Sequence, residues 1–208
     1  ISNKHQLLRL DHEQTHDVLE QENLALIEAF SQHINDCDVV ILEDYNKGVL
    51  TQNNIPVLID IALKANKPIA VDPKKNNFLL YQNVTLFKPN LKEFVEGTKI
   101  DWEVFNLDTL KDKAKEFKAE LNIDKLLITL SEKGALICGE KEIHVPAEIR
   151  NIADVSGAGD TVIAVASLAL SSGLSDEEIV RISNLAGGLV CEKVGVVPVD
   201  KLQLLAEA

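Results

Sequence analysis

Short apolar runs and longer stretches with an apolar residue at every third or fourth position follow one another along the chain. Short runs rich in β-branched residues are typical of buried strands, and the wider spacing is typical of amphipathic helices. The runs predict strands at 39–42, 68–71, 84–87, 125–130 and 135–138, and the spaced stretches predict helices at 17–34, 51–66, 91–96, 106–121, 161–170, 175–194 and 201–206. Pro56, inside the second of these helices, marks a late start or a kink.

The order of these elements predicts the fold class. Strands that alternate with helices form a mostly parallel sheet with helices on both faces, which is an α/β fold in three layers. The turn from Ser131 to Gly134 joins the last two predicted strands, so we expect an antiparallel hairpin at one edge of the sheet.

Composition narrows the classes of partner. The 208 residues include 33 acidic and 21 basic side chains, so the net charge of -12 repels nucleic acid and anionic membrane. No apolar run approaches the roughly 18 residues of a membrane span, and we expect a cytoplasmic protein. The three cysteines stand in apolar runs and are expected to be small buried hydrophobic residues, and the histidines show no zinc-ligand spacing.

Polar residues follow several predicted strands directly. Asp44, Asp72 and Asn90 come after three of them, and Thr129 lies near the end of another. In a parallel sheet, ligands bind at the carboxyl ends of the strands. We therefore expect these four side chains to mark the ligand-binding edge.

The segment from Asp154 to Thr161 reads Asp-Val-Ser-Gly-Ala-Gly-Asp-Thr and stands directly before an apolar helix. Two glycines around one alanine allow a sharp turn whose N–H groups form an anion cradle at the helix N-terminus. The pattern is neither a Walker A loop nor a dinucleotide-binding loop. From spacing alone, a tight turn with a helix cap explains the segment equally well.

This segment resembles the C-terminal signature of the ribokinase/PfkB family of sugar kinases. The resemblance implies a ribokinase-like fold and phosphoryl transfer from ATP with Mg²⁺. It makes Asp160 the general base, and it makes the amides of Gly157, Ala158 and Gly159 the anion hole for the transferred group. A carboxylate beside such a cradle is suited to accept the proton of a hydroxyl group.

The segment Asn90-Leu91-Lys92-Glu93 has two interpretations. Asn followed three residues later by Glu is a capping-box pattern at the start of a helix. It also resembles the Asn-x-x-Glu motif of the family, which lies near the nucleotide phosphates. That resemblance implies that Asn90, Leu91, Lys92 and Glu93 are nucleotide-binding and that Glu93 holds Mg²⁺ through water.

The turn from Thr129 to Gly134 is explained by a hairpin with Gly134 at positive φ. The resemblance adds that Thr129, Ser131 and Gly134 contact ATP, although many members of the family have Gly where Ser131 stands. It also places Asn184 and Gly195 in the adenine pocket. Helix packing explains Asn184 equally well.

Three segments are similar to bacterial heptose-phosphate kinases, namely 8–11, 43–48 and Asp72-Pro73-Lys74. Those kinases have Ser-Asp-Tyr-Gly-Lys-Gly where this chain has Glu43-Asp44-Tyr45-Asn46-Lys47-Gly48, so Glu43 and Asn46 depart from the pattern. The likeness makes Asp44, Lys47, Asp72 and Lys74 candidate contacts to substrate or phosphate. For Lys47 and Lys74 the alternative is that each is a solvated loop lysine.

Together these motifs predict an ATP-dependent kinase with heptose 7-phosphate as acceptor and a homodimeric state. Another sugar or a nucleoside as acceptor is the first alternative, and a nucleotide-binding fragment without turnover is the second. The absence of a Gly-x-Gly-x-x-Gly pattern after an early strand disfavours a dehydrogenase. The resemblance also predicts that residues 1–208 are the C-terminal two-thirds of one kinase domain, without its N-terminal part and much of its lid.

Overall fold

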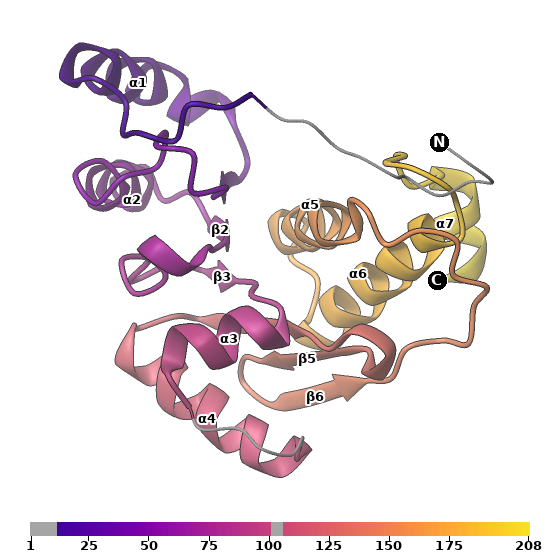
Figure 1. Ribbon diagram of the computed structural model, residues 1–208. Helices are drawn as coiled ribbons and strands as arrows, with labels where there is room; N and C mark the ends of the chain where they lie inside the picture. Colours follow the sequence, from indigo (N-terminus) through magenta and orange to yellow (C-terminus); the bar gives the residue numbers. More distant parts are fainter. Residues whose placement is uncertain (1–11, 101–105) are drawn as a thin grey trace.

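A central mixed sheet with helices on both sides organises the computed structural model, which describes residues 12–100 and 106–208 (Figure 1). The strands are β1 (Val40–Glu43), β2 (Ile69–Asp72), β3 (Leu86–Phe87), β4 (Lys125–Thr129), β5 (Ala135–Cys138) and β6 (Glu142–Val145). The helices are α1 (Glu20–His33), α2 (Ile55–Lys64), α3 (Leu91–Thr98), α4 (Leu107–Glu120), α5 (Ala158–Ser171), α6 (Asp176–Cys191) and α7 (Lys201–Glu207).

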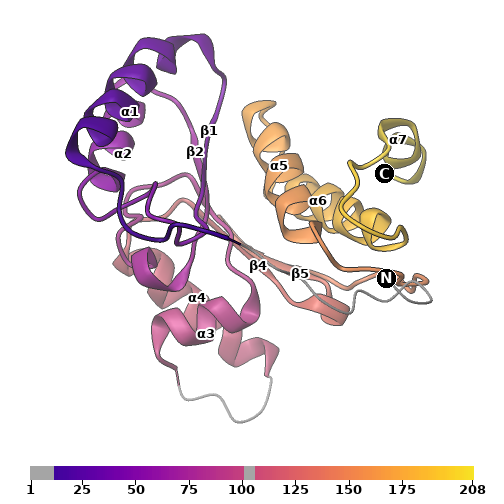
Figure 2. The ribbon, with the colours of Figure 1, turned by 45° about the horizontal axis from the view of Figure 1, so that its top comes forward.

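The strands lie in the sheet in the order of the sequence, from β1 to β6. The first four are parallel, whereas β5 and β6 are antiparallel to their neighbours. Right-handed crossovers that all advance in one direction place their helices on the same face. Accordingly, α2 lies on one side of β1 and β2, and the other side faces α5 and α6 (Figure 2).

Alternating side chains divide the interior into two cores. Phe87, Leu126 and Ile128 face one core with the aromatic side chains Phe78 and Phe117. On the other face, β2 to β5 contribute Ala70, Leu86, Leu127, Ala135 and Ile137 to a second core with α5 and α6. The three-layer α/β/α architecture predicted from the sequence is confirmed.

Local chemistry explains where the observed elements differ from the predicted ones. Helix α2 begins at Ile55 and not near Thr51, because Pro56 occupies its first turn. Helix α5 begins at Ala158, three residues before the predicted start, and so includes Asp160 in its first turn. Strand β6 was not predicted: its four residues alternate between polar and apolar as in a half-buried strand, but they are at the shortest length at which that pattern is informative.

Cys138 and Cys191 are buried, and Cys37 is partly buried, which confirms their reading as packed residues. Among the helices of residues 12–100 and 106–208, we find none with the length and apolar character needed to cross a membrane.

Candidate active site

Two neighbouring strands end in acidic residues that share one face of the sheet. Glu43 of β1 and Asp72 of β2 are direct partners in the parallel register. Side chains alternate along a strand, so Asp72 lies on the same face as Ala70, which packs in the core beneath α5 and α6. The register therefore directs both carboxylates toward the N-terminus of α5.

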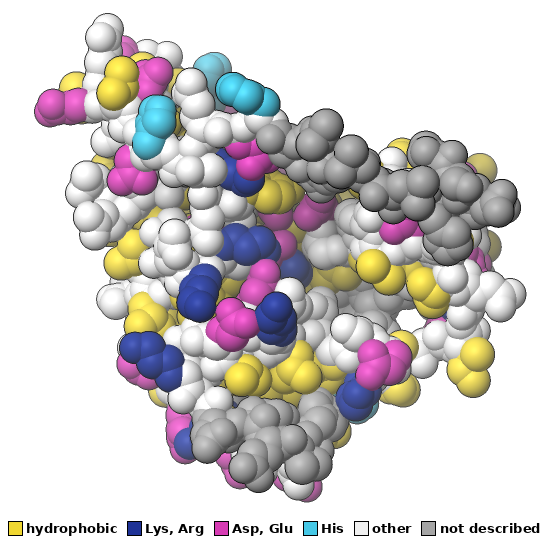
Figure 3. Space-filling model, viewed as in Figure 1, with side chains coloured by type: hydrophobic (Ala, Val, Ile, Leu, Met, Phe, Trp, Pro, Cys, Tyr) yellow, Lys and Arg dark blue, Asp and Glu magenta, His cyan; other side chains and the backbone are white. Residues whose placement is uncertain are grey.

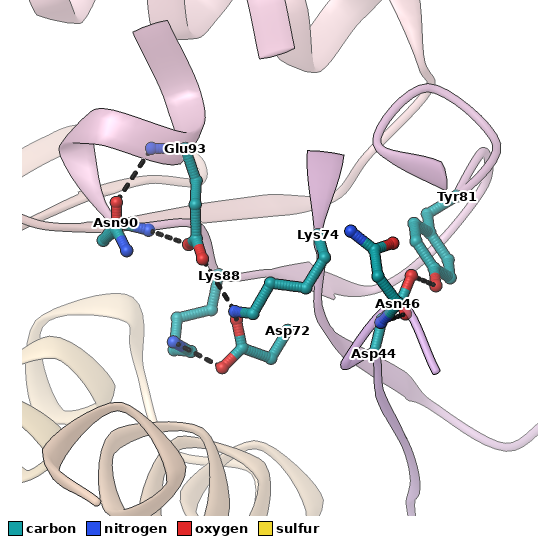
Figure 4. Close-up of polar contacts among 8 residues, drawn as sticks. All are labelled: Asp44, Asn46, Asp72, Lys74, Tyr81, Lys88, Asn90 and Glu93. Carbon is teal, nitrogen blue, oxygen red and sulfur yellow. Dashed lines mark hydrogen bonds and ion pairs between the residues drawn. The ribbon is translucent and has the colours of Figure 1, made fainter. Parts of the chain in front are cut away.

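Lys88 follows β3 and reaches across to Asp72 (Figure 4). Its Nζ atom lies 3.0 Å from Oδ2 of Asp72, and the two side chains are only 3% and 4% exposed. A Cβ atom at Gly159 would lie 3.7 Å from the same Nζ atom. The buried ion pair therefore stands beside the glycine segment that begins α5.

Gly157 is the N-cap of α5 and has a φ of +78°, a conformation that glycine adopts without strain. The first bond of the helix runs from the Thr161 amide to the Gly157 carbonyl at 3.0 Å. The amides of Gly159 and Asp160 precede this bond and lie at the positive end of the helix dipole. The anion-hole role of these amides stays a prediction, and a helix N-terminus of this kind is suited to it.

Asp154 holds the loop ahead of α5. Its carboxylate accepts hydrogen bonds from the backbone amide and hydroxyl of Ser156 at 3.0 and 2.8 Å, and from the Gly195 amide at 3.0 Å. These bonds, led by that of the Ser156 amide, lower the pKa of Asp154. The Ala158 amide donates to the Val155 carbonyl at 3.3 Å and closes the turn.

Three carboxylates converge at the mouth of this loop. Oxygen atoms of Glu43, Asp72 and Asp160 all lie within 4.8 Å of one another. Asp160 is exposed, whereas Asp72 is buried. Burial, followed by the charge of Asp72, raises the pKa of Glu43 to about 7, and Lys88 acts in the opposite direction.

Asn90 and Glu93 form a complete capping box at the start of α3. The Asn90 amide donates to Oε2 of Glu93 at 2.9 Å, and the Glu93 amide donates to Oδ1 of Asn90 at 2.8 Å. Lys74 then links Glu93 to Asp72, with its Nζ atom 2.7 Å from Oε1 of Glu93 and 3.5 Å from Oδ1 of Asp72 (Figure 4). Capping is thus present, and the same carboxylate also faces the candidate site.

Thr129 ends β4 beside Asn90, with which it forms an isolated parallel bridge. Ser131 has a φ of +54°, and this left-handed conformation explains why glycine suits the position in similar kinases. Gly134 has a φ of +89°, as predicted, and a Cβ atom there would lie 2.0 Å from the carbonyl oxygen of Val145.

The sequence pattern that defines pfkB family carbohydrate kinases matches residues 8–201. The chain belongs to this family. It is 40% identical over 206 residues to the bifunctional protein HldE of Koribacter versatilis, covering 99% of this chain and 42% of that protein. It is 41% identical over 212 residues to HldE of Caulobacter sp. strain K31, again covering 99% of this chain and 42% of the relative. The chain therefore spans less than half the length of these curated relatives.

Solved structures show the same fold at lower identity. Phosphofructokinase-2 of Escherichia coli superposes with a TM-score of 0.80 at 22% identity, covering 91% of this chain and 62% of that one. Ribokinase of Arabidopsis thaliana, solved with ribose and ATP, gives a TM-score of 0.73 at 20% identity, covering 91% and 59%. These matches confirm the ribokinase-like fold of this pfkB family chain.

Within this pfkB family chain, Asp44 lies away from the three carboxylates. It is 1% exposed and accepts hydrogen bonds from the Tyr81 hydroxyl at 2.7 Å and from Asn77 at 2.9 Å. These bonds hold the Asp44 carboxylate in place, and its contact with substrate stays a prediction. Lys47 pairs with Glu13, and its contact with phosphate likewise stays a prediction.

The remaining predicted residues are dispersed. Asn184 lines a cavity of about 330 Å³ between α6 and the segment after β6, and its amide donates to the Pro146 carbonyl at 3.1 Å. Leu91 packs against the core, and Lys92 pairs with Glu96 at 3.9 Å on the surface. Of the four residues at 90–93, Asn90 and Glu93 are the ones with side-chain contacts to each other and toward the site.

The sequence analysis assigned no role to Lys88 and treated Glu43 only as a departure from the relatives' pattern. The position of Lys88 directly before Pro89-Asn90, at a strand end, was the available signal. Figure 3 shows the face of the molecule that is seen in Figure 1, and basic and acidic side chains lie close together in its middle.

Proposed function

We propose that this chain carries the phosphoryl-transfer site of an ATP- and Mg²⁺-dependent sugar kinase whose acceptor is heptose 7-phosphate. The observation that carries the proposal is the position of Asp160 in the first turn of α5, next to the Gly159 amide and within 4.8 Å of Asp72. Identity of about 40% to HldE proteins over nearly the whole chain supports the heptose subtype, as do the segments 43–48, 72–74 and 129–134.

The chemistry follows from where these groups lie. The Asp160 carboxylate accepts the proton of the acceptor hydroxyl while the hydroxyl oxygen forms a bond to the γ-phosphorus. The bond from that phosphorus to the bridging oxygen breaks, and ADP leaves with the electron pair. The amides at the start of α5 meet the charge on the transferred oxygens, and Lys88 adds a buried positive charge nearby.

Glu93 suits a metal ion held through water. Both of its oxygens already have direct partners, Oε1 with Lys74 and Oε2 with the Asn90 amide. A water bridge would leave these bonds intact, which fits the chemistry of Mg²⁺, an ion that keeps several of its waters. When bound, Mg²⁺ supplies charge neutralisation for the nucleotide phosphates.

A homodimeric state and a cytoplasmic location are part of this proposal. The acidic composition supports the location, and the tetrameric form in which phosphofructokinase-2 of Escherichia coli has been solved supports self-association. Sedimentation equilibrium of the purified full-length protein tests the first, because a monomer-only result would remove it.

Acceptor-dependent release of ADP tests the proposed function. The full-length protein is incubated with Mg-ATP and heptose 7-phosphate, ribose, fructose or a nucleoside, and kcat/KM is compared across the panel. We expect the highest value with heptose 7-phosphate. A preference for an unphosphorylated sugar would reject the subtype, and binding of ATP without release of ADP for any acceptor would favour a nucleotide-binding protein.

A further inference from the structure

Glu43 places a third carboxylate in a site that holds few positive charges. Its in-register partner is Asp72, and both lie within 4.8 Å of an Asp160 oxygen. Lys88 pairs with Asp72 at 3.0 Å, whereas Lys74 lies closer to Glu93 than to Asp72, at 2.7 and 3.5 Å. Among residues 12–100 and 106–208, Lys88 is therefore the buried ammonium group that faces these three carboxylates.

Carboxylates that share a site cannot all ionise near neutral pH without strong mutual repulsion. Burial of Glu43 acts together with the charges of Asp72 and Asp160 to raise its pKa to about 7, so Glu43 retains a proton up to about that pH. In that form its O–H can donate a hydrogen bond to the Asp72 carboxylate, whose charge and acceptor oxygen favour the proton on Glu43. The arrangement makes a continuous line from Glu43 through Asp72 to Lys88 and the Gly159 segment.

We propose that protonated Glu43 is a positioning residue of the kinase reaction, which holds Asp72 against Lys88 and limits the negative charge beside Asp160. This inference rests on the proposed function and adds a residue to it. Ionisation of Glu43 adds a negative charge where an anionic phosphoryl group must bind, and it weakens the bond that fixes Asp72. Turnover therefore falls as Glu43 loses its proton.

The charged and titratable groups around Glu43 come from four elements. Asp72 belongs to β2, Lys88 follows β3, Asp160 belongs to α5, and Tyr45 stands in the loop after β1. Asp72 and Asp160 favour the protonated form of Glu43, whereas Lys88 favours the ionised form. The opposing charges of these neighbouring side chains thus contribute to the pKa of Glu43.

A serine at position 43 isolates the effect of the charge, because a serine hydroxyl carries no charge in this pH range. A pH-dependent loss of turnover that originates at position 43 should therefore disappear when Glu43 is replaced by serine.

The test compares the full-length protein with Glu43→Gln, Glu43→Ser and the surface control Glu20→Gln. Glutamine mimics the neutral carboxyl group, since it keeps the size and one hydrogen-bond donor. We expect kcat of the parent to fall about tenfold per pH unit above a pH of about 7. The Glu43→Gln and Glu43→Ser profiles should lack this fall, and Glu20→Gln should keep it.

A second readout does not depend on turnover. The pKa of Glu43 is raised in the folded protein from 4.5 to about 7, so the folded state binds the extra proton within that window. The stabilisation is present below about pH 4.5 and is lost as the pH rises to about 7. The Tm of the parent minus that of Glu43→Gln should therefore decrease across this range.

Each outcome supports or overturns the inference. A parental pH profile in Glu43→Gln would overturn it, even if the Tm difference were as expected. If Mg²⁺ raised the Tm of the parent but not that of Glu43→Gln, the three carboxylates would be a cation site. That result would also overturn the inference. If the parent showed no turnover at any pH while the Tm difference between parent and Glu43→Gln was as expected, the proposed function would fail. The positioning role, which rests on that function, would fail with it.

Discussion

The Nζ atom of Lys88 lies 3.0 Å from Oδ2 of Asp72, and both side chains are almost completely buried. A buried ion pair contributes modestly while it is intact, but removal of one partner leaves a desolvated charge. Here that charge would be the Asp72 carboxylate, which already has Glu43 and Asp160 as neighbours. The pair therefore controls both the stability of the sheet edge and the charge of the site.

We expect Lys88→Met to destabilise the protein by about 3 kcal/mol, near the low end for a broken buried pair because Lys74 still faces Asp72. The double variant Lys88→Met/Asp72→Asn should lose less than the single variant, since it leaves no unpaired charge. Urea unfolding of both variants and of the exposed-pair control Lys64→Met measures this. Equal losses in the single and double variants would contradict the account.

Gly134 combines a positive φ with a close approach to another strand. We expect Gly134→Ala to lower stability by more than the roughly 1 to 2 kcal/mol of a left-handed alanine. Its Cβ atom would lie 2.0 Å from the Val145 carbonyl oxygen, and its φ of +89° and ψ of -133° lie outside the left-handed helical region. Gly173→Ala is the matched control, since Gly173 has a φ of +74° and no heavy atom within 4 Å of an added Cβ. Similar values of Tm for the two variants would refute the clash.

The fold was predictable because its strands are continuous apolar runs between helical patterns. Element ends were less predictable: the helix before the second strand was expected from residue 51, but Pro56 sets its start at Ile55. Tertiary contacts explain the misses in the site. The position of Lys88 at a strand end is a weak local signal, and its pairing with Asp72 appears only when β2 and β3 lie side by side.

The distinction between Glu43 and Asp44 shows the same limit. They are adjacent in sequence, yet strand alternation sends Glu43 toward α5 and buries Asp44 against Tyr81. The resemblance pointed to Asp44, because it matches the relatives' pattern where Glu43 does not. Strand β1 ends at Glu43, one residue later than predicted. This end had to be known before Glu43 and Asp44 could be assigned to opposite faces of the sheet.

Glu93 and Glu178 occupy equivalent positions in two capping boxes, at the starts of α3 and α6. Gln retains the cap in either helix, so we expect Glu93→Gln and Glu178→Gln to leave Tm within about 3 °C of the parent. Glu93→Gln should nevertheless raise the Mg²⁺ concentration needed for half-maximal turnover by about tenfold, because a neutral amide is a weaker partner for metal-bound water. Glu178→Gln should not. An unchanged Mg²⁺ dependence in Glu93→Gln would limit Glu93 to capping.

The assignment of Asp160 as the general base is the central claim. Asp160→Asn keeps the size of the side chain and its place in the first turn of α5, but the amide cannot accept the hydroxyl proton. Asp200→Asn is the control, because Asp200 likewise stands at the start of a helix, where it caps α7 by accepting the Gln203 amide at 2.8 Å. Both variants should fold with a Tm close to that of the parent.

The deciding measurement is kcat of full-length Asp160→Asn under saturating Mg-ATP and heptose 7-phosphate, together with its affinity for ATP. We predict that kcat falls by roughly 10² to 10⁴ while ATP affinity stays within about threefold, because general base catalysis contributes that range. Retention of more than about a tenth of the parental kcat would contradict the account, since that loss lies below the expected range.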